Sequence, residues 1–351
     1  MNTFGGEDPA LATLLLPFAT GALAWPDARV LFVNARDGWP LQAVPRQRIV
    51  CVQDFKPHAD ALQSGGLAVA ARDDGETFPL VLFLPPRQRI EARAELARAA
   101  QRAIGGTIVA SIANNEGARS GEADMQRLLG PVQCISKNHC RVFWARVQDE
   151  TLDRALLDEW TKIDAPQPIA DGRFVSRPGV FAWDRIDAAS ELLATHLPDD
   201  LSGRGADLGA GFGYLSVEVL ARCMRVASLD LYEADARALE LARTNLANAN
   251  ARRSAPAKLD FLWHDVAAGL PRRYDFIVTN PPFHVGRADE PQLGRAFIAA
   301  AADALDPRGR LWLVANRHLP YESILNERFA TVRTVVTEHG FKVIEAVMAA
   351  S

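Results

Sequence analysis

Cysteine is scarce in this chain, and the few cysteines are too scattered to form a recognisable site. The 351 residues include four of them, Cys51, Cys134, Cys140 and Cys223. None belongs to a C-x-x-C pair, a spacing typical of zinc sites, so we expect no metal. Their small number indicates a reducing compartment, where unpaired cysteines act as small core residues.

The sequence also lacks a long apolar run and a strong charge of one sign. Residues 10–25 are apolar, but Glu7 and Asp8 precede them and Pro17 interrupts them. Neither a secretory signal nor a membrane span is therefore predicted, and we expect a cytoplasmic protein with no membrane partner. The formal net charge is -4. Nucleic acid would feel no general attraction to such a chain, so any contact must rest on local patches.

The composition itself is that of a globular protein, with 48% hydrophobic and 23% charged residues. The length suffices for two domains, each with its own core. A stretch rich in proline and glycine, residues 165–179, predicts a linker near the middle. We therefore expect one domain over residues 1–165 and another over residues 166–351.

Both halves alternate strand-like and helix-like segments, which predicts an α/β fold with a mostly parallel sheet. The second half has strand candidates at 205–208, 225–232, 258–263, 274–279 and 310–315, and a hairpin at 331–337 and 341–347. The first half has them at 29–34, 48–53, 66–71, 79–84 and 107–112, with a helix at 88–103 and a hairpin at 132–136 and 141–147. The chain reads as one architecture written twice.

A glycine-rich loop follows the first strand of the second half, in the stretch A-D-L-G-A-G-F-G. Gly209, Gly211 and Gly213 let the backbone turn tightly and approach a ligand closely, which side chains would prevent. Asp207 lies just before them. The pattern predicts a cofactor site, although a dinucleotide-binding fold would use the same glycines.

Acidic residues end the next two strands and extend this site. Glu233 can accept both hydroxyls of a ribose, a device that dehydrogenases share, and Asp230 is a competitor for that role. Asp265 follows the third strand, where it can accept the amino group of an adenine. His264 has no second histidine or acid at metal spacing and is interpreted as a residue of the strand edge.

The fourth strand ends abruptly in Asn280-Pro281-Pro282-Phe283. Asn280 and the Pro281 carbonyl can each accept one hydrogen of a planar amine, and both bonds improve as the nitrogen becomes pyramidal. The prolines fix φ and hold these acceptors in place. Phe283 can stack on an extruded base.

This motif resembles that of the amino-group methyltransferases, and the chain as a whole is similar to the guanine-N2 methyltransferases of ribosomal RNA. The similarity extends to the entry segment at Pro178–Phe181 with Ile186-Asp187, and to residues 113–122. It implies two tandem Rossmann-like class I methyltransferase domains, S-adenosylmethionine as the cofactor, and ribosomal RNA or a ribosomal subunit as the partner of a monomer. Adenine N6, a protein glutamine, or a non-catalytic role in RNA binding or assembly are the alternatives.

Some positions depart from the family or extend the hypothesis. Ala182-Trp183-Asp184-Arg185 replaces the usual Ser-Arg after the entry phenylalanine, next to the expected substrate. His284 is expected either in the pocket wall or against the substrate. Arg272, Arg273, Arg287 and Arg317 are the expected phosphate contacts around the pocket.

The first half can be aligned with the second, but it lacks the site residues. Only Gly38 keeps its place, against Gly213, while Lys56 falls opposite Glu233, Leu84 opposite Asn280, and Arg87 opposite Phe283. These changes remove loop flexibility, the ribose acceptor and the amine acceptor. We therefore expect a degenerate domain, kept for RNA docking or for folding support.

Overall fold

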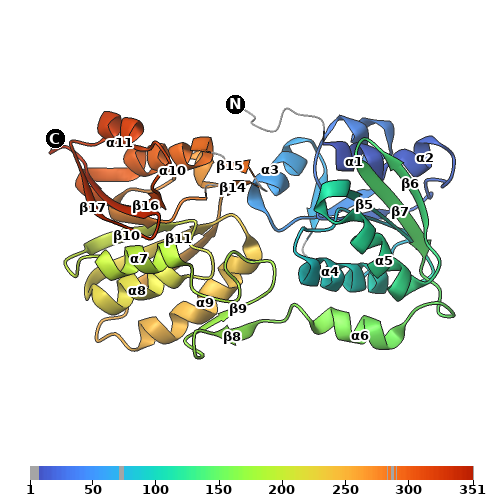
Figure 1. Ribbon diagram of the computed structural model, residues 1–351, viewed down its shortest axis with the longest axis horizontal. Coiled ribbons are helices and arrows are strands. Elements are labelled where there is room, and N and C mark those ends of the chain that lie inside the picture. Colours follow the sequence, from blue (N-terminus) through green and yellow to red (C-terminus); the bar gives the residue numbers. More distant parts are fainter. Residues whose placement is uncertain (1–7, 71–74, 283, 286–287, 290, 351) are drawn as a thin grey trace. The chain divides into compact units, whose positions relative to one another are not determined.

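A computed structural model of the protein describes residues 8–70, 75–282, 284–285, 288–289 and 291–350. The chain divides into two compact units, Met1–Ala165 and Pro166–Ser351. Within the described residues, each unit has its own seven-stranded sheet with helices packed against it (Figure 1).

The sheet of the C-terminal unit has five parallel strands followed by an antiparallel hairpin. Its strands are β10 (Ser202–Leu208), β11 (Arg225–Glu233), β12 (Lys258–Trp263), β13 (Tyr274–Thr279), β16 (Leu305–Asn316), β17 (Thr331–Glu338) and β18 (Phe341–Val347). They lie in the order β12-β11-β10-β13-β16-β18-β17. The carboxyl ends of the parallel strands therefore meet at one edge, where ligands of such folds bind.

Helices cover both faces of this sheet. They are α7 (Ala188–His196), α8 (Tyr214–Arg222), α9 (Ala236–Ala251), α10 (Pro291–Ala304) and α11 (Glu322–Arg328). Side chains of α7, α8 and α9 form one buried cluster with the sheet, and those of α10 and α11 form another. Figure 1 shows these two groups of helices on opposite sides of the sheet. A short ladder, β14 (His284–Val285) with β15 (Ala288–Asp289), follows β13.

The predicted linker is an ordered part of the C-terminal unit. Residues Gln167–Ile169 (β8) and Phe174–Ser176 (β9) pair as an antiparallel hairpin. Asn245 of α9 accepts a hydrogen bond from the Val175 N–H at 2.8 Å and donates one to the Val175 carbonyl at 2.9 Å. Phe174 is buried against the aromatic rings of Phe212 and Tyr214. The expectation of a plain linker was wrong because these long-range contacts fix the segment.

The N-terminal unit repeats the same sheet. Its strands are β1 (Val30–Val33), β2 (Ile49–Val52), β3 (Ala68–Ala70), β4 (Leu80–Phe83), β5 (Thr107–Ala113), β6 (Gln133–Lys137) and β7 (Cys140–Arg146). They lie in the order β3-β2-β1-β4-β5-β7-β6, which is the order of the C-terminal sheet. The prediction of one architecture present twice is confirmed.

The helices of the N-terminal unit depart from this symmetry most clearly between β1 and β2. They are α1 (Pro9–Leu14), α2 (Leu16–Ala19), α3 (Lys56–Ser64), α4 (Arg89–Arg102), α5 (Ala118–Leu129) and α6 (Arg154–Lys162), with 3-10 turns at Trp39–Ala43, Arg46–Arg48 and Asn114–Glu116. Between β1 and β2, where the other unit has α8, the described chain forms only the first two of these turns. Pro40 and Pro45 lack the N–H groups that a continuous helix there would use.

Candidate active site

The glycine loop joins β10 to α8 at the carboxyl edge of the C-terminal sheet. Gly209, Gly211 and Gly213 all have positive φ, at 71°, 55° and 90°. A Cβ on Gly213 would lie 2.6 Å from the Leu246 side chain, whereas one on Gly211 would meet no atom within 4 Å. Gly213 is thus needed for packing against α9, and Gly211 faces open space that a ligand can approach.

Glu233 ties this loop to the end of β11. Its Oε2 accepts the Gly211 N–H at 2.7 Å, and its Oε1 accepts the Asp235 N–H at 2.8 Å. Burial of the carboxyl group raises the pKa of Glu233 to about 7, although backbone hydrogen bonds from Asp235, Gly211 and Ala234 oppose that shift. The Glu233 carboxyl group therefore fixes the backbone of the loop at Gly211.

Asp207 is more deeply buried than we expected for a residue that contacts a ligand. It is 0% exposed, and its Oδ2 accepts the Ser216 hydroxyl at 2.7 Å. Burial raises the pKa of Asp207 to about 7. Its Oδ1 is buried with no hydrogen-bond partner in the described structure, so an acceptor remains there for a water or a ligand donor.

Asp230, the competitor for the ribose role, is engaged on the opposite face of the sheet. Its Oδ2 accepts the Tyr274 hydroxyl at 2.7 Å and an Arg272 N–H at 2.8 Å.

Arg273 pairs with Asp306 at 2.8 Å. Arg272 and Arg273 precede β13, so they lie at the amino edge of the sheet, and their predicted place beside the pocket is wrong.

The end of β12 carries Asp265 and His264, as expected from the sequence. The Asp265 side chain accepts the Ala267 N–H at 2.9 Å and caps a 3-10 turn at Val266–Ala268. The His264 Nε2 lies 2.6 Å from the Gly269 carbonyl, which agrees with its interpretation as a residue of the strand edge. Arg317 follows β16 at the same sheet edge and is exposed.

Asn280 follows β13 directly and points its amide nitrogen at the start of α7. The Nδ2 group donates to Asp187 Oδ2 at 3.0 Å and to Ser190 Oγ at 2.9 Å. The Thr279 hydroxyl donates to the Leu208 carbonyl at 2.7 Å, which joins the ends of β13 and β10. Pro281 is buried and Pro282 is half-buried. The predicted stacking residue Phe283, Arg287 and the His284 side chain lie outside the described residues.

Asn280 and the glycine loop line one hollow in the C-terminal unit, whereas Asp207, Glu233 and Asp265 are not among its lining residues. The hollow and its open mouth together hold about 430 Å³ of space free of atoms. Its walls come from four places: Phe181 and Ala182 of the entry segment, Asp187 and Ser190 at the start of α7, the loop from Gly209 to Leu215, and Asn280. The Phe181 ring is 63% exposed at this hollow.

Ser190 is a functional candidate that sequence reasoning did not identify, and Asp187 was singled out only as part of the entry segment, without a role. An aspartate before an apolar helix is a visible N-cap signal, and Asp187 does accept the Ser190 N–H at 2.9 Å. Their contact with Asn280, far along the chain, has no local sequence signal.

The N-terminal unit fills the equivalent place with an ion pair. The Ala35 N–H donates to the Val52 carbonyl as the Ala210 N–H does to Tyr232, which puts Arg36 at the position of Gly211. The Arg36 guanidinium donates to Asp8 at 2.8 Å. Asp8 is the N-cap of α1, the helix that packs on β5 and β7 as α7 packs on β16 and β18.

The same strand register corrects the alignment of Lys56 with Glu233 and confirms that of Leu84 with Asn280. Phe55 N–H donates to Gln53 Oε1 at 2.9 Å, as Asp235 N–H does to Glu233, so Gln53 rather than Lys56 is the counterpart of Glu233. The acid is replaced by an amide, not by the opposite charge. Leu84 follows β4 as Asn280 follows β13, in equal register with the first strand. It is buried and apolar, as predicted.

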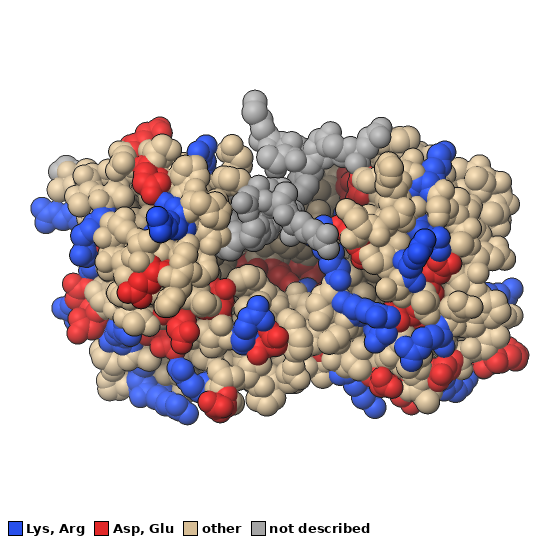
Figure 2. Space-filling view, viewed as in Figure 1, with Lys and Arg blue, Asp and Glu red and all other residues tan. Residues whose placement is uncertain are grey.

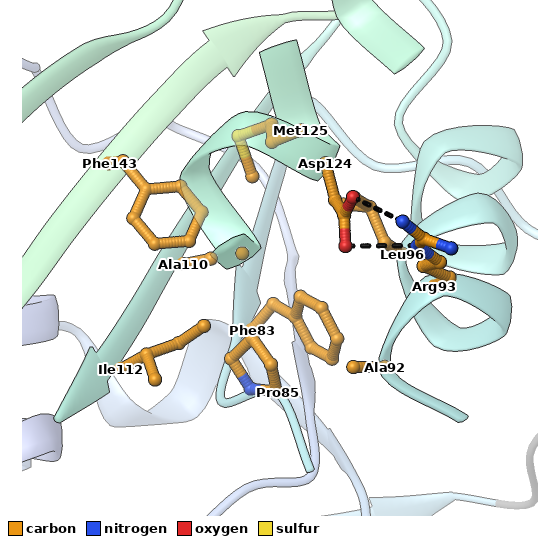
Figure 3. A pocket seen from close by; sticks show the side chains of 11 residues that line it. Phe83, Pro85, Ala92, Arg93, Leu96, Ala110, Ile112, Asp124, Met125 and Phe143 are labelled. Carbon is orange, nitrogen blue, oxygen red and sulfur yellow. Dashed lines mark hydrogen bonds and ion pairs between the residues drawn. The ribbon is translucent and has the colours of Figure 1, made fainter. Parts of the chain in front are cut away.

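The arginines of the N-terminal unit are mostly engaged within that unit. Arg89 and Arg93 both bind Asp124, at 2.9 Å each, and Arg98 binds Asp164 at 2.8 Å. Figure 3 shows Arg93 paired with Asp124 among the mostly apolar side chains of a hollow lined by α4, α5 and strands of the sheet. On the face drawn in Figure 2, basic and acidic side chains of the described residues are interspersed over both units.

The described residues offer neither a membrane-spanning helix nor a cluster of metal ligands. None of the described helices is long and apolar enough to cross a membrane. No group of three or more His, Cys, Asp or Glu side chains among the described residues could hold a metal ion.

Comparisons with known proteins agree with this geometry. The family model described as Methyltransferase small domain matches residues 171–345. The chain is 28% identical over 324 residues to the ribosomal RNA small subunit methyltransferase C of Psychromonas ingrahamii, covering 90% of each chain. It is 31% identical over 271 residues to the protein of that name from Pseudomonas aeruginosa, covering 76% of this chain and 78% of the relative.

A solved structure matches both units. It is the T. thermophilus 16S rRNA N2 G1207 methyltransferase in complex with AdoMet and guanosine, with a TM-score of 0.78 and 26% identity. The match covers 98% of this chain and 93% of that one. The chain therefore belongs to the ribosomal RNA small subunit methyltransferase C family.

Proposed function

We propose that this protein transfers a methyl group from S-adenosylmethionine to the exocyclic N2 amine of a guanine in ribosomal RNA. Family membership supports this reaction. The observation that carries it is that Asn280, an acceptor suited to a planar amine, lines the same hollow as the glycine loop. Donor and acceptor can therefore meet in one cavity.

The residues around the loop fit the donor. Gly209, Gly211 and Gly213 would let it approach the backbone, because a side chain at Gly211 would extend into space that is now open. Glu233 would accept the ribose hydroxyls, and Asp265 the adenine amino group. Asp207 would support the loop from below, with one buried oxygen still free to accept a hydrogen bond.

Asn280 and Pro281 would act on the amine. S-adenosylmethionine, when bound, supplies a methyl group on a cationic sulfur, and the electrons of the sulfur–carbon bond stay on the sulfur when that bond breaks. The N2 lone pair forms the new N–C bond, and the nitrogen then loses a proton to solvent. Asn280 Oδ1 and the Pro281 carbonyl accept the amine hydrogens, and these bonds strengthen as the nitrogen becomes pyramidal. No strong base is needed.

The substrate base would be held by aromatic rings. Phe283 follows the two prolines in sequence and is our candidate for stacking on the extruded guanine. Phe181, exposed at the mouth of the hollow, is a second ring available to the RNA. Both would favour a base turned out of its stack.

Replacement of Asn280 by alanine tests the proposal directly. We expect donor affinity, measured by calorimetry, to stay within a few-fold of wild type. Turnover in labelled-methyl transfer to small-subunit ribosomal RNA should fall about 10²-fold or more, by comparison with loss of an oxyanion donor. Equal turnover by the two proteins would refute the role of Asn280.

Analysis of the methylated nucleoside tests the substrate. Digestion of the labelled RNA should give N2-methylguanosine as the labelled product. Label in adenosine, or label only in protein, would refute guanine N2 and favour the alternative acceptors.

We further propose a division of labour between the two units. Residues 166–351 would carry the reaction, and residues 1–165 would form a degenerate domain for RNA docking or folding support. The Arg36–Asp8 ion pair and the buried Leu84 support this proposal. The partner would be the RNA of the small ribosomal subunit, met by a monomer in the cytoplasm.

A further inference from the structure

The direction of the Asn280 carboxamide is fixed by two acceptors. An amide nitrogen has two hydrogens, and here one acceptor, Asp187 Oδ2 or Ser190 Oγ, lies within 3.0 Å for each. A carboxylate can only accept. If the amide flipped, Asn280 Oδ1 would face the Asp187 carboxylate, and two acceptors would be opposed in a half-buried place. Only one orientation of the amide is therefore compatible with α7.

The two acceptors belong to a rigid element. Asp187 is the N-cap of α7, and the same Oδ2 that binds Asn280 also accepts the Ser190 N–H at 2.9 Å. Ser190 is buried, and α7 is anchored in the core by Ala189 and Leu193. A site built on a packed helix holds its geometry better than one built on a loop alone.

We propose that Asp187 and Ser190 are positioning residues that hold the Asn280 Nδ2 group and so aim its Oδ1 at the amine to be methylated. The inference rests on the proposed function, since the amine is the substrate proposed above. It goes further because it assigns to α7 the orientation of the Asn280 carboxamide relative to that amine. Asp187 and Ser190 would act through Asn280, not on the substrate.

The N-terminal unit provides a natural control for the helix cap. Asp8 caps α1 as Asp187 caps α7, with its carboxylate accepting two backbone N–H groups at 3.0 Å. The residue in the place of Asn280 is Leu84, which offers no amide. Loss of Asp8 therefore removes a cap without removing an amide clamp.

The experiment compares Asp187→Ala, Asp187→Asn, Ser190→Ala and Asp8→Ala in the full-length chain. Methyl transfer to ribosomal RNA gives kcat, calorimetry gives donor affinity, and thermal unfolding reports on the lost caps. Asp187→Ala should lower kcat about 10- to 100-fold with nearly unchanged donor affinity, because a small misplacement of a reacting group has such an effect. Ser190→Ala should lower it about 2- to 10-fold, the effect of one neutral hydrogen bond.

Asp187→Asn should keep most of the turnover, because the asparagine Oδ1 can still accept both N–H groups and cap the helix. Asp8→Ala should lower thermal stability while leaving kcat within twofold of wild type. In an Asn280→Ala background, Asp187→Ala should lower kcat no further, since the two residues act as a unit.

Three results would overturn the positioning role. The first is an Asp187→Ala protein as active as the Asp8→Ala protein. The second is an effect of Asp187→Ala on donor affinity alone. The third is a full further loss of kcat when Asp187→Ala is added to Asn280→Ala. Failure of the proposed function has a different signature. The wild-type protein would then methylate another amine or none, and with another amine the same comparison still tests the clamp.

Discussion

At the scale of the residue, the Glu233 carboxyl group is held by backbone donors beside its proposed ligand. A carboxylate offers about four lone-pair positions. The Gly211 and Asp235 N–H groups occupy one on each oxygen. The Ala234 backbone N–H is a further donor to this carboxyl. The carboxylate would thus couple the geometry of the glycine loop to the proposed binding of ribose.

The raised pKa of Glu233 predicts that donor binding depends on pH. With a pKa of about 7, the group is mostly protonated at pH 6 and mostly ionised at pH 8. Only the ionised form accepts freely at both oxygens, so donor affinity should rise about 10-fold over this range, as measured by calorimetry. The gain appears as pH rises, because the proton that competes with ribose is then lost.

Glu233→Gln is the matched control for this prediction. An amide fits such a position, since Gln53 occupies the equivalent place and donates to the Ala35 carbonyl at 2.7 Å. The variant should bind the donor more weakly at pH 8 and show little dependence on pH. A full pH dependence in Glu233→Gln would transfer the titration to Asp207, whose pKa is raised to a similar value.

At the scale of the element, Asn245 connects the β8–β9 hairpin to the glycine loop. Its buried side chain makes the two bonds to Val175 and donates a third to the Phe212 carbonyl, at 2.8 Å. Phe212 belongs to the loop that lines the hollow. The hairpin therefore braces the cofactor site from outside the sheet.

Asn245→Ala should loosen this brace, and Asn250→Ala on the same helix is its control. Asn250 makes a similar pair of bonds with the Ala257 backbone at the far end of α9. Each substitution leaves buried backbone groups unpaired, which should cost about 1–3 kcal/mol and lower the melting temperature by several degrees. Only Asn245→Ala should also weaken donor binding. Equal donor affinity in both variants would contradict the brace.

Most helices and strands could be predicted from the sequence, whereas correspondences and contacts between residues far apart in the chain could not. The period of apolar residues and the turn-forming glycines predict the strands of both sheets, and Lys258–Trp263 and Tyr274–Thr279 agree to the residue. The alignment of Lys56 with Glu233 failed because it matched residue letters within the helices, whereas α3 begins at Lys56 and α9 at Ala236, at the same offset from Gln53 and Glu233. Contacts such as Asn280 with Asp187 depend on tertiary packing, which no local pattern encodes.

At the scale of the whole molecule, the two units share a topology and differ in what occupies the edge of the sheet. In the C-terminal unit, Gly211 faces open space and its N–H donates to Glu233; in the N-terminal unit, Arg36 takes the place of Gly211 and pairs with Asp8. Topology is set by buried strands and is retained when loop residues change. The same fold can therefore keep its core while losing a cofactor site.

This contrast predicts the stoichiometry of donor binding. Calorimetry on the full-length chain should give one donor per chain, because only the C-terminal unit combines the glycine loop with an acid. Gln53→Ala should leave that single site intact, whereas Glu233→Ala should weaken it strongly. Two sites in the wild type, or a residual site of wild-type affinity in Glu233→Ala, would mean that the N-terminal unit also binds the donor despite its Arg36–Asp8 ion pair.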